Sequence, residues 1–314
     1  MNGILFLFFA FLLILSTIKL TEYTYILKNS DITNFFVKNI LSVVILGIPI
    51  LVTYLTSLFI NNPYLAISNI IGSNIFNFVI LAFLNIIFIK KNLFKKISPY
   101  YFYINSLLVY IYIVIINILM IKKSSLFKTI GPNILVIIFY FIYLFFLSKI
   151  NLKKKITIKA NKVINIKFFI YLFLVIIFSI TLTLYTDYLS FNFPKFSSSI
   201  IGLFLLGITT SLPKIISSYT LIKNNYYDLV LSDIIGSNMF NFLLLTITNF
   251  FFKKSIYFFI TQQSLFIIKM TLYIHLLFYL YIIRNKALSK IFHIIISLMI
   301  IVIYLYSWKT LIID

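Results

Sequence analysis

The feature that most constrains this chain is a stretch of sequence that it contains twice. Residues 69–78 read NIIGSNIFNF, and 164 residues later residues 233–242 read DIIGSNMFNF. When 64–85 is aligned with 228–249, 12 of the 22 positions are identical. Six of these identical residues are Ser, Gly or Asn, whereas any two apolar segments share mainly aliphatic residues. The chain therefore contains an internal duplication.

A proline precedes each copy at the same distance. Pro49 lies 20 residues before Asn69, and Pro213 lies 20 residues before Asp233. Proline removes a backbone donor from a helix and frees a carbonyl one turn back. In hydrocarbon, such irregular backbone survives only where protein or a watery cavity satisfies it. Each copy is predicted to be a helix broken by proline beside a helix rich in small and amide residues, and the freed carbonyls are suited to bind cations.

The composition predicts a membrane protein that crosses the bilayer many times. Hydrophobic residues make up 62% of the chain, charged residues 11%, and the mean hydropathy is +1.09. A spanning helix needs about 20 mainly apolar residues, so 314 residues leave room for about ten. The first apolar run, 4–18, has no basic residue before it and no small-residue cleavage site after it, which predicts a retained helix. The absence of cysteine excludes disulfides and thiolate metal sites.

The net charge of +21 does not indicate nucleic-acid binding, because most basic residues lie in short loops between apolar segments. With the N-terminus outside, the cytoplasmic loops hold 18 basic residues and the outer segments hold 7. Cytoplasmic loops of membrane proteins are enriched in Lys and Arg. The chain is therefore predicted to be a multi-pass protein of the cell membrane, in contact with the lipid bilayer, with both termini on the outer side.

Five predicted helices separate equivalent points of the two copies, and an odd number turns the second copy upside down in the membrane. The predicted fold is an all-α polytopic membrane protein of about ten transmembrane helices, arranged as two inverted five-helix repeats. Transporters built in this way hold their ions where broken helices of both halves meet. The first half is 1–150 (copy at about 40–85), a basic cytoplasmic linker is 151–167, and the second half is 168–314 (copy at about 204–249).

One acidic residue of six, Asp233, falls well inside a predicted span. A carboxylate within the membrane is costly and marks an ion or proton site by default, although a structural ion pair is the alternative. Lys214 follows Pro213 and also lies inside a span, so it is the predicted partner of Asp233. Pairing would neutralise two charges that the low-dielectric interior does not tolerate alone.

Small and amide residues of the two copies are suited to helix packing. Gly72 and Gly236 permit close approach of neighbouring helices. The Ser and Asn residues supply oxygens and hydrogen bonds between helices, and for Asn77 and Asn241 the structural role is favoured. These residues are Ser73, Asn74 and Asn77 with their equivalents Ser237, Asn238 and Asn241.

The paired motifs GSNIFN and GSNMFN, together with TSLPK at 210–214, resemble the cation/calcium exchanger superfamily, whose membrane region is that of the sodium/calcium exchangers. The resemblance covers both copies and agrees with the ten-helix layout. It implies a secondary active antiporter that uses a sodium, potassium or proton gradient to move calcium by alternating access. The implied partners are small inorganic cations (Na⁺, Ca²⁺ or H⁺), and no cofactor is implied.

The resemblance also assigns roles to individual residues. Asn69 and Asp233 match the amide or carboxylate of the central site, and are the positions implied for a bound metal. Hydroxyl or carbonyl oxygens are implied at four further positions, Thr210, Ser211, Ser73 and Ser237.

The sequence departs from the family at the main calcium ligands. In the family, a glutamate follows the repeat proline in both copies and supplies these ligands. Here those positions hold Ile50 and Lys214. Calcium takes six to eight oxygens, several of them from carboxylates. Two unit charges about 4 Å apart interact by about 4 kcal/mol at an effective dielectric of 20, so Lys214 is expected to repel a divalent cation.

Three functions remain open from the sequence. The first is an active antiporter with altered ion choice, in which Lys214 stands in for a bound cation. The second is a transport-inactive descendant with a regulatory or assembly role, favoured by the loss of both glutamates. The third is an intramembrane enzyme, but its candidates His275 and His293 lie on different predicted helices without acidic neighbours, and no catalytic motif is present. The prediction is a transporter, not an enzyme.

Overall fold

The protein was analysed as a computed structural model, which describes residues 2–28, 45, 47–91, 93, 97–120, 126–150, 162–193, 197–251, 255–283 and 290–313. All elements within these ranges are helical. Nine helical segments in this part of the chain are long and apolar enough to cross a membrane, judged by length and composition, and α3 (Ile48–Phe59) is a shorter apolar helix. The predicted all-α membrane fold is confirmed.

The first half of the chain contains α1, α3, α4, α5 and α6, and the second half repeats this order from α7 to α13. The bounds of the first half are α1 (Asn2–Lys28), α3 (Ile48–Phe59), α4 (Pro63–Ile87), η1 (Ile89–Lys91), α5 (Tyr100–Met120) and α6 (Leu126–Lys149). Those of the second are α7 (Lys162–Asn192), α8 (Ser198–Ile201), η3 (Gly202–Leu206), α9 (Gly207–Ser211), α10 (Pro213–Lys223), α11 (Tyr227–Phe251), η4 (Ile256–Phe259), α12 (Gln262–Ile283) and α13 (Lys290–Ile313). The α7 helix begins inside the predicted linker 151–167, of which 151–161 lie outside the described residues.

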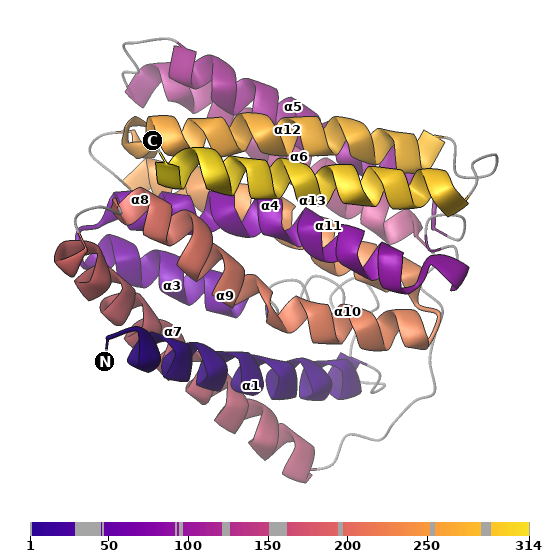
Figure 1. Cartoon of the computed structure of the whole chain (residues 1–314), viewed down its shortest axis with the longest axis horizontal. Coiled ribbons are helices and arrows are strands. Elements are labelled where there is room, and N and C mark those ends of the chain that lie inside the picture. The colour runs from indigo at the N-terminus through magenta and orange to yellow at the C-terminus, as the bar shows by residue number, and fades with distance from the viewer. Residues whose placement is uncertain are drawn as a thin grey trace.

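Helix packing follows the internal duplication. Equivalent helices of the two halves pack together: α1 with α7, α4 with α11, and α5 with α12. Other contacts occur twice, once in each half. The contact of α4 with α13 corresponds to that of α11 with α6, and the contact of α3 with α7 corresponds to that of α10 with α1. Figure 1 shows α1 and α7 at one edge of the bundle, with α4 and α11 in its middle. The first helix begins and the last one ends at the same end of the bundle, as expected for an even number of crossings (Figure 1).

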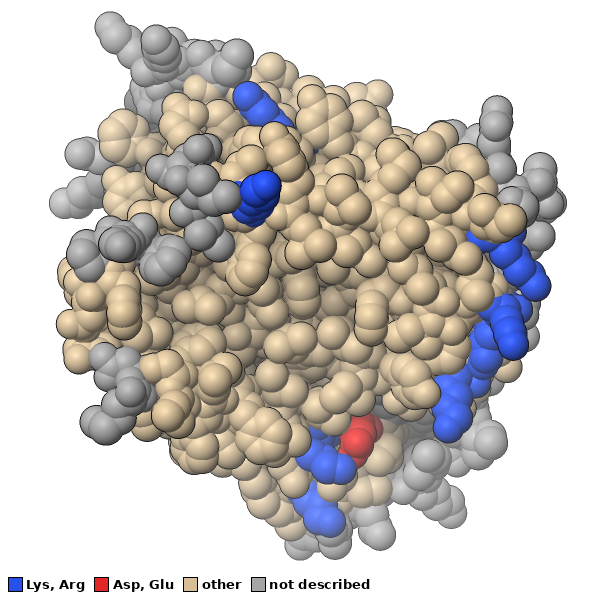
Figure 2. Space-filling model, viewed as in Figure 1, with Lys and Arg blue, Asp and Glu red and all other residues tan. Residues whose placement is uncertain are grey.

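The apolar side chains form two cores of unequal size. The larger surrounds α4 and α11, and the smaller joins α1 to α7 with a few residues of neighbouring helices. Many large apolar side chains face outward, such as Phe141, which is 65% exposed, and Phe173, which is 63% exposed. Figure 2 shows a broad uncharged face with Lys and Arg gathered toward its margins. Apolar surface of this extent exceeds what a monomer exposes to water and fits contact with lipid.

Glycines allow the two halves to touch backbone to backbone at the centre. A Cβ atom on Gly72 of α4 would lie 1.9 Å from the carbonyl oxygen of Leu203, in the π-helical turn η3. A Cβ on Gly207 would lie 2.8 Å from the carbonyl carbon of Gly72. The close approach predicted for Gly72 is thus a crossing with a helix of the other half. Gly236 is buried on α11.

Candidate ion-binding site

The two GSN motifs meet at the centre of the bundle through their amide side chains. Asn77 Nδ2 donates to Asn238 Oδ1 at 2.6 Å, and Asn241 Nδ2 donates to Asn74 Oδ1 at 2.7 Å. Asn74 is equivalent to Asn238 in the duplication, and Asn77 is equivalent to Asn241. Each of these two hydrogen bonds is therefore the counterpart of the other. The later asparagine of each motif pairs with the earlier asparagine of the other, so α4 and α11 run antiparallel here. All four amides are buried. They join the two repeats, and we refer to these four asparagines as the repeat joint.

Lys214 of α10 extends its ammonium into this joint. Its Nζ donates to Asn77 Oδ1 at 3.1 Å and to Ser237 Oγ at 2.9 Å. The residue is only 6% exposed. The Ser237 hydroxyl donates in turn to the carbonyl of Ile234 at 2.9 Å, which leaves its lone pairs to face the ammonium. A buried positive charge is therefore held by neutral oxygens from both copies.

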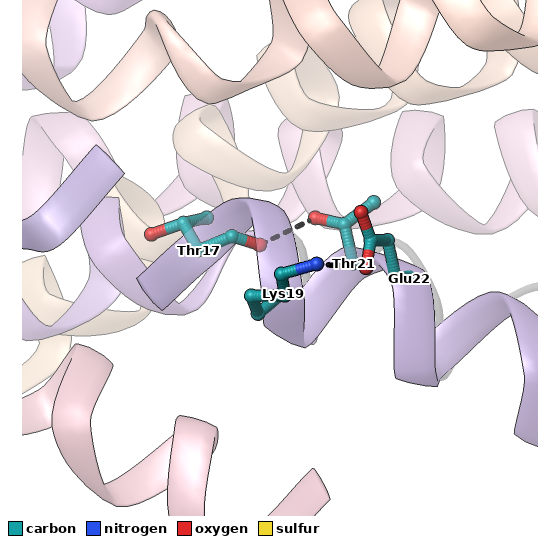
Figure 3. Close-up of polar contacts among 4 residues, drawn as sticks. All are labelled: Thr17, Lys19, Thr21 and Glu22. Carbon is teal, nitrogen blue, oxygen red and sulfur yellow. Dashed lines mark hydrogen bonds and ion pairs between the residues drawn. The ribbon is translucent and has the colours of Figure 1, made fainter. Parts of the chain in front are cut away.

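The direct pairing of Lys214 with Asp233 stays a prediction. An exposed ion pair joins Lys19 and Glu22 on α1, with 2.8 Å between Nζ and Oε2. Figure 3 shows this contact, whose two side chains are 49% and 53% exposed. Asp233 is buried on α11, and its charge favours the Lys214 ammonium. The lysine side chain is long enough to reach across to α4, and there it meets the Asn77 amide.

A second polar cluster joins α4 to α3 and α9. Asn69 Nδ2 donates to Thr53 Oγ1 at 2.7 Å. Thr210 Oγ1, which donates to the Leu206 carbonyl at 2.8 Å, lies 3.4 Å from Asn69 Oδ1. The hydroxyls of Ser73 and Thr210 lie 3.1 Å apart, and Ser73 Oγ donates to the carbonyl of Gly207 at 3.3 Å. Hydroxyl hydrogen bonds are usually about 2.7–2.8 Å long. The contacts of Ser73 with Thr210 and with the Gly207 carbonyl are longer than this, so these oxygens are not tightly bonded to one another.

The remaining predicted residues lie along the proline segments. Ser211 ends α9 and Pro213 begins α10, so the second proline stands at a helix junction. The buried Ser211 hydroxyl has no hydrogen-bond partner among the described residues. Pro49 is the second residue of α3, and Ile50 is completely buried in the larger apolar core.

The structure thus sorts the six predicted ion-binding residues. Three of them form the second cluster, one contacts the Lys214 ammonium, and two are buried on α9 and α11. In that order they are Asn69, Ser73 and Thr210, then Ser237, then Ser211 and Asp233.

Sequence reasoning missed two members of the site. Thr53 lies four residues after Pro49, on the same helix face one turn later, and this spacing would have pointed to it. Asn77 was assigned to packing alone, but its Oδ1 accepts from Lys214. An asparagine offers both a donor and an acceptor, so the same side chain bonds the opposite helix and the ammonium.

The chemistry of this region is that of neutral oxygens. In the described part of the chain, no three His, Cys, Asp or Glu side chains gather as they would around a metal ion. The two histidines lie elsewhere: His275 Nδ1 contacts Asn105 Oδ1 at 2.7 Å, and the rings of His293 and Tyr281 stack at 5.5 Å. Both are engaged in helix packing.

Comparison with known proteins gives a family match for the second half of the chain and a fold for nearly all of it. Residues 165–308 match the family model described as "sodium/calcium exchanger protein". By sequence, no curated protein is a significant match.

Three solved structures cover nearly the whole chain. Native YfkE has a TM-score of 0.73 at 16% identity, and the match covers 100% of this chain and 93% of YfkE. The H⁺/Ca²⁺ exchanger CAX has a TM-score of 0.62 at 11% identity, covering 99% and 89%. The sodium-calcium exchanger NCX_Mj has a TM-score of 0.58 at 17% identity, covering 96% and 98%. In sequence, the second half of the chain resembles the sodium/calcium exchanger proteins, and the whole chain has the fold of these three solved structures.

Proposed function

We propose that this protein is a secondary active cation antiporter that works by alternating access, with its ion site at the interface of the repeats. The observation that carries the proposal is the meeting of Asn69 and Ser73, from the first copy, with Thr210, from the second. A site shared by two inverted repeats opens to opposite sides when one group of helices moves against the other. The exchange activities named for CAX and NCX_Mj support the same class of function.

The moving parts suggested by the packing are the two cores. The α1–α7 pair has its own apolar cluster and packs against α3 and α10, which carry the two prolines. The α4–α11 pair is joined by four amides within the larger core. Rocking of the α1–α7 unit over a fixed α4–α11 centre would expose Asn69, Ser73 and Thr210 alternately to the two sides.

The ion that fits this site is monovalent. Calcium binding draws on several carboxylates, whereas the oxygens of the second cluster belong to an amide, hydroxyls and a carbonyl. The buried Lys214 ammonium adds a positive charge to the same interface. Repulsion from that charge acts twice as strongly on a divalent ion as on a monovalent one. Sodium, or a proton in its place, is the proposed cargo, and calcium is not.

The test is ion uptake by proteoliposomes under an imposed sodium or proton gradient. The proposal expects gradient-driven uptake of radiolabelled sodium above that of empty liposomes, and no uptake of radiolabelled calcium. Calcium uptake at a rate similar to that of sodium would overturn the ion assignment. Absence of both fluxes, in protein that elutes as a single folded species, would overturn the transport proposal.

A second candidate is a transport-inactive protein that retains the exchanger scaffold in a regulatory or assembly role. The specific observation in its favour is that the residue after the first repeat proline is apolar. This residue, Ile50, is completely buried in the larger core and offers no oxygen to an ion. The uptake experiment separates the two candidates, since an inactive scaffold moves neither ion.

A further inference from the structure

The residue after the repeat proline has opposite chemistry in the two copies. Ile50 follows Pro49, and Lys214 follows Pro213, so the two are equivalent under the duplication. Ile50 packs in the apolar core, whereas the Lys214 ammonium contacts Asn77 Oδ1 and Ser237 Oγ. The serines of the two GSN motifs, Ser73 and Ser237, are equivalent as well. One serine has a protein cation beside it, and the other does not.

The surroundings of the Lys214 ammonium are those of a bound monovalent cation. Its acceptors are oxygens 2.9 and 3.1 Å away, contributed by α11 and α4. The charge of Asp233 on α11 also favours the ammonium. An isolated ammonium in an apolar interior is very unfavourable, so the oxygens and the carboxylate charge together make this position selective for a positive group.

The surroundings of Ser73 offer the same kind of oxygens without a tethered charge. Thr210 Oγ1, Asn69 Oδ1 and the Gly207 carbonyl approach one another at 3.1–3.4 Å. The buried Ser211 hydroxyl, next to Thr210 in sequence, has no hydrogen-bond partner among the described residues. The Thr210 hydroxyl donates to the Leu206 carbonyl at 2.8 Å, which leaves its lone pairs, like those of the unpartnered Ser211 hydroxyl, available to a small cation.

We propose that the Lys214 ammonium is a tethered cation that fills one of two cation positions, which lie beside the equivalent serines Ser237 and Ser73, so that the protein holds one mobile monovalent cation, at Asn69, Ser73 and Thr210. The inference rests on the proposed antiporter function and specifies its site. It makes Lys214 the residue that sets both the number and the valence of the ions bound.

The first test uses the unmodified protein and measures binding, which does not require transport. Equilibrium binding of radiolabelled sodium to purified protein is expected to saturate at one ion per chain, and radiolabelled calcium is expected to show no saturable binding. Two or more sodium ions per chain, or saturable calcium binding, would overturn the inference. One bound sodium without gradient-driven flux would instead retire the transport proposal alone.

The second test is chemical rescue of Lys214→Ala by methylammonium, which resembles the missing end of the side chain. Methylammonium is expected to raise the Tm of this variant in detergent by several degrees in a saturable manner. Tetramethylammonium, which has no N–H donor, is the control ion and is expected to have no such effect. Lys223→Ala, at the exposed end of the same helix, is the control variant. Equal effects of the two ions on Lys214→Ala, or equal responses of the two variants, would contradict the inference.

The third test reverses the charge at the same position. Lys214→Glu is expected to bind calcium at least about tenfold more tightly than the unmodified protein, a change of about 1.4 kcal/mol. Lys223→Glu alters the net charge equally on the exposed surface and is expected to leave calcium binding unchanged. If Lys214→Glu folds and gains no calcium affinity, the Lys214 ammonium does not set the valence of the bound ion, and the inference is overturned. If neither Lys214 variant folds, the sodium stoichiometry of the unmodified protein decides the question.

Discussion

The two proline segments began as copies of one sequence and now serve different purposes. In the first, Pro49 is buried, Ile50 belongs to the apolar core, and Thr53, one turn later on α3, bonds to Asn69. In the second, Pro213 begins a helix whose next residue, Lys214, delivers a charge to the repeat joint. The difference teaches that an inverted repeat preserves its joint while its ion chemistry diverges. The paired asparagines kept their symmetry, and the residues around them did not.

The largest expected effect concerns the joint. Gly72→Val should prevent folding, because even the Cβ atom would lie 1.9 Å from the Leu203 carbonyl oxygen and both partners are backbone. Size-exclusion chromatography in detergent is expected to show aggregated protein. Gly131→Val is the matched control, since a Cβ there meets nothing within 4 Å. A folded Gly72→Val protein with the same Tm as the control would mean that the crossing is looser than the structure shows.

The next effect concerns the one buried carboxylate at the equivalent of Asn69. Asp233→Asn makes the two copies identical at this position and removes the negative charge that faces the Lys214 ammonium. Gradient-driven sodium flux in proteoliposomes is expected to be abolished. Glu22→Gln removes a carboxylate from an exposed ion pair and should leave the flux unchanged. Undiminished flux in Asp233→Asn would exclude this residue from the mechanism.

Equivalent asparagines should differ in their contribution to stability. Asn77→Leu removes an acceptor from the buried Lys214 ammonium, and stranding a buried charge costs about 3–5 kcal/mol. Asn241→Leu removes the hydrogen bond to Asn74, and a single buried hydrogen bond is worth about 1–2 kcal/mol. The Tm in detergent should therefore fall further in Asn77→Leu. Equal losses would show that the ammonium draws its stabilisation from elsewhere.

The smallest effect concerns the apolar equivalent of Lys214. Ile50→Val deletes one buried methylene group, which typically costs about 0.5–1.5 kcal/mol. Ile216→Val, on α10 and 45% exposed, should cost less. Thermal unfolding in detergent compares the two variants, and sodium flux should be unaffected in both. A loss of flux in Ile50→Val would place this residue in the ion pathway.

Much of the fold follows from the sequence because its causes are local. Apolar runs long enough to span a bilayer predict helices, and the spacing of the GSN motifs predicts an inverted pair. The antiparallel contact of Asn74 with Asn241 agrees with that arrangement. The wide π-helical turn at 202–206 was not predicted, because it depends on how closely another helix approaches its glycines.

The site was less predictable, since its contacts join residues more than a hundred positions apart. The sequence indicated that Lys214 needs a partner, but several polar residues stood within reach of a flexible side chain. Asp233 was the strongest candidate by charge, and the structure adds hydrogen bonds from the ammonium to Asn77 and Ser237 that the sequence did not indicate. The pairing of Asn69 with Thr53 was equally hidden, because nothing local fixes how α3 lies against α4.

The sequence by itself determined that this protein is a membrane-embedded duplication with a broken, amide-rich centre, because hydrophobicity and the repeated motif are properties of the chain alone. The tertiary structure decided which oxygens surround the buried ammonium and which remain for a mobile ion. The physical reason is that helices crossing at a shared glycine contact bring together side chains whose positions depend on the rotation and depth of each helix. Those two quantities are set by packing among all the helices, and no single segment encodes them.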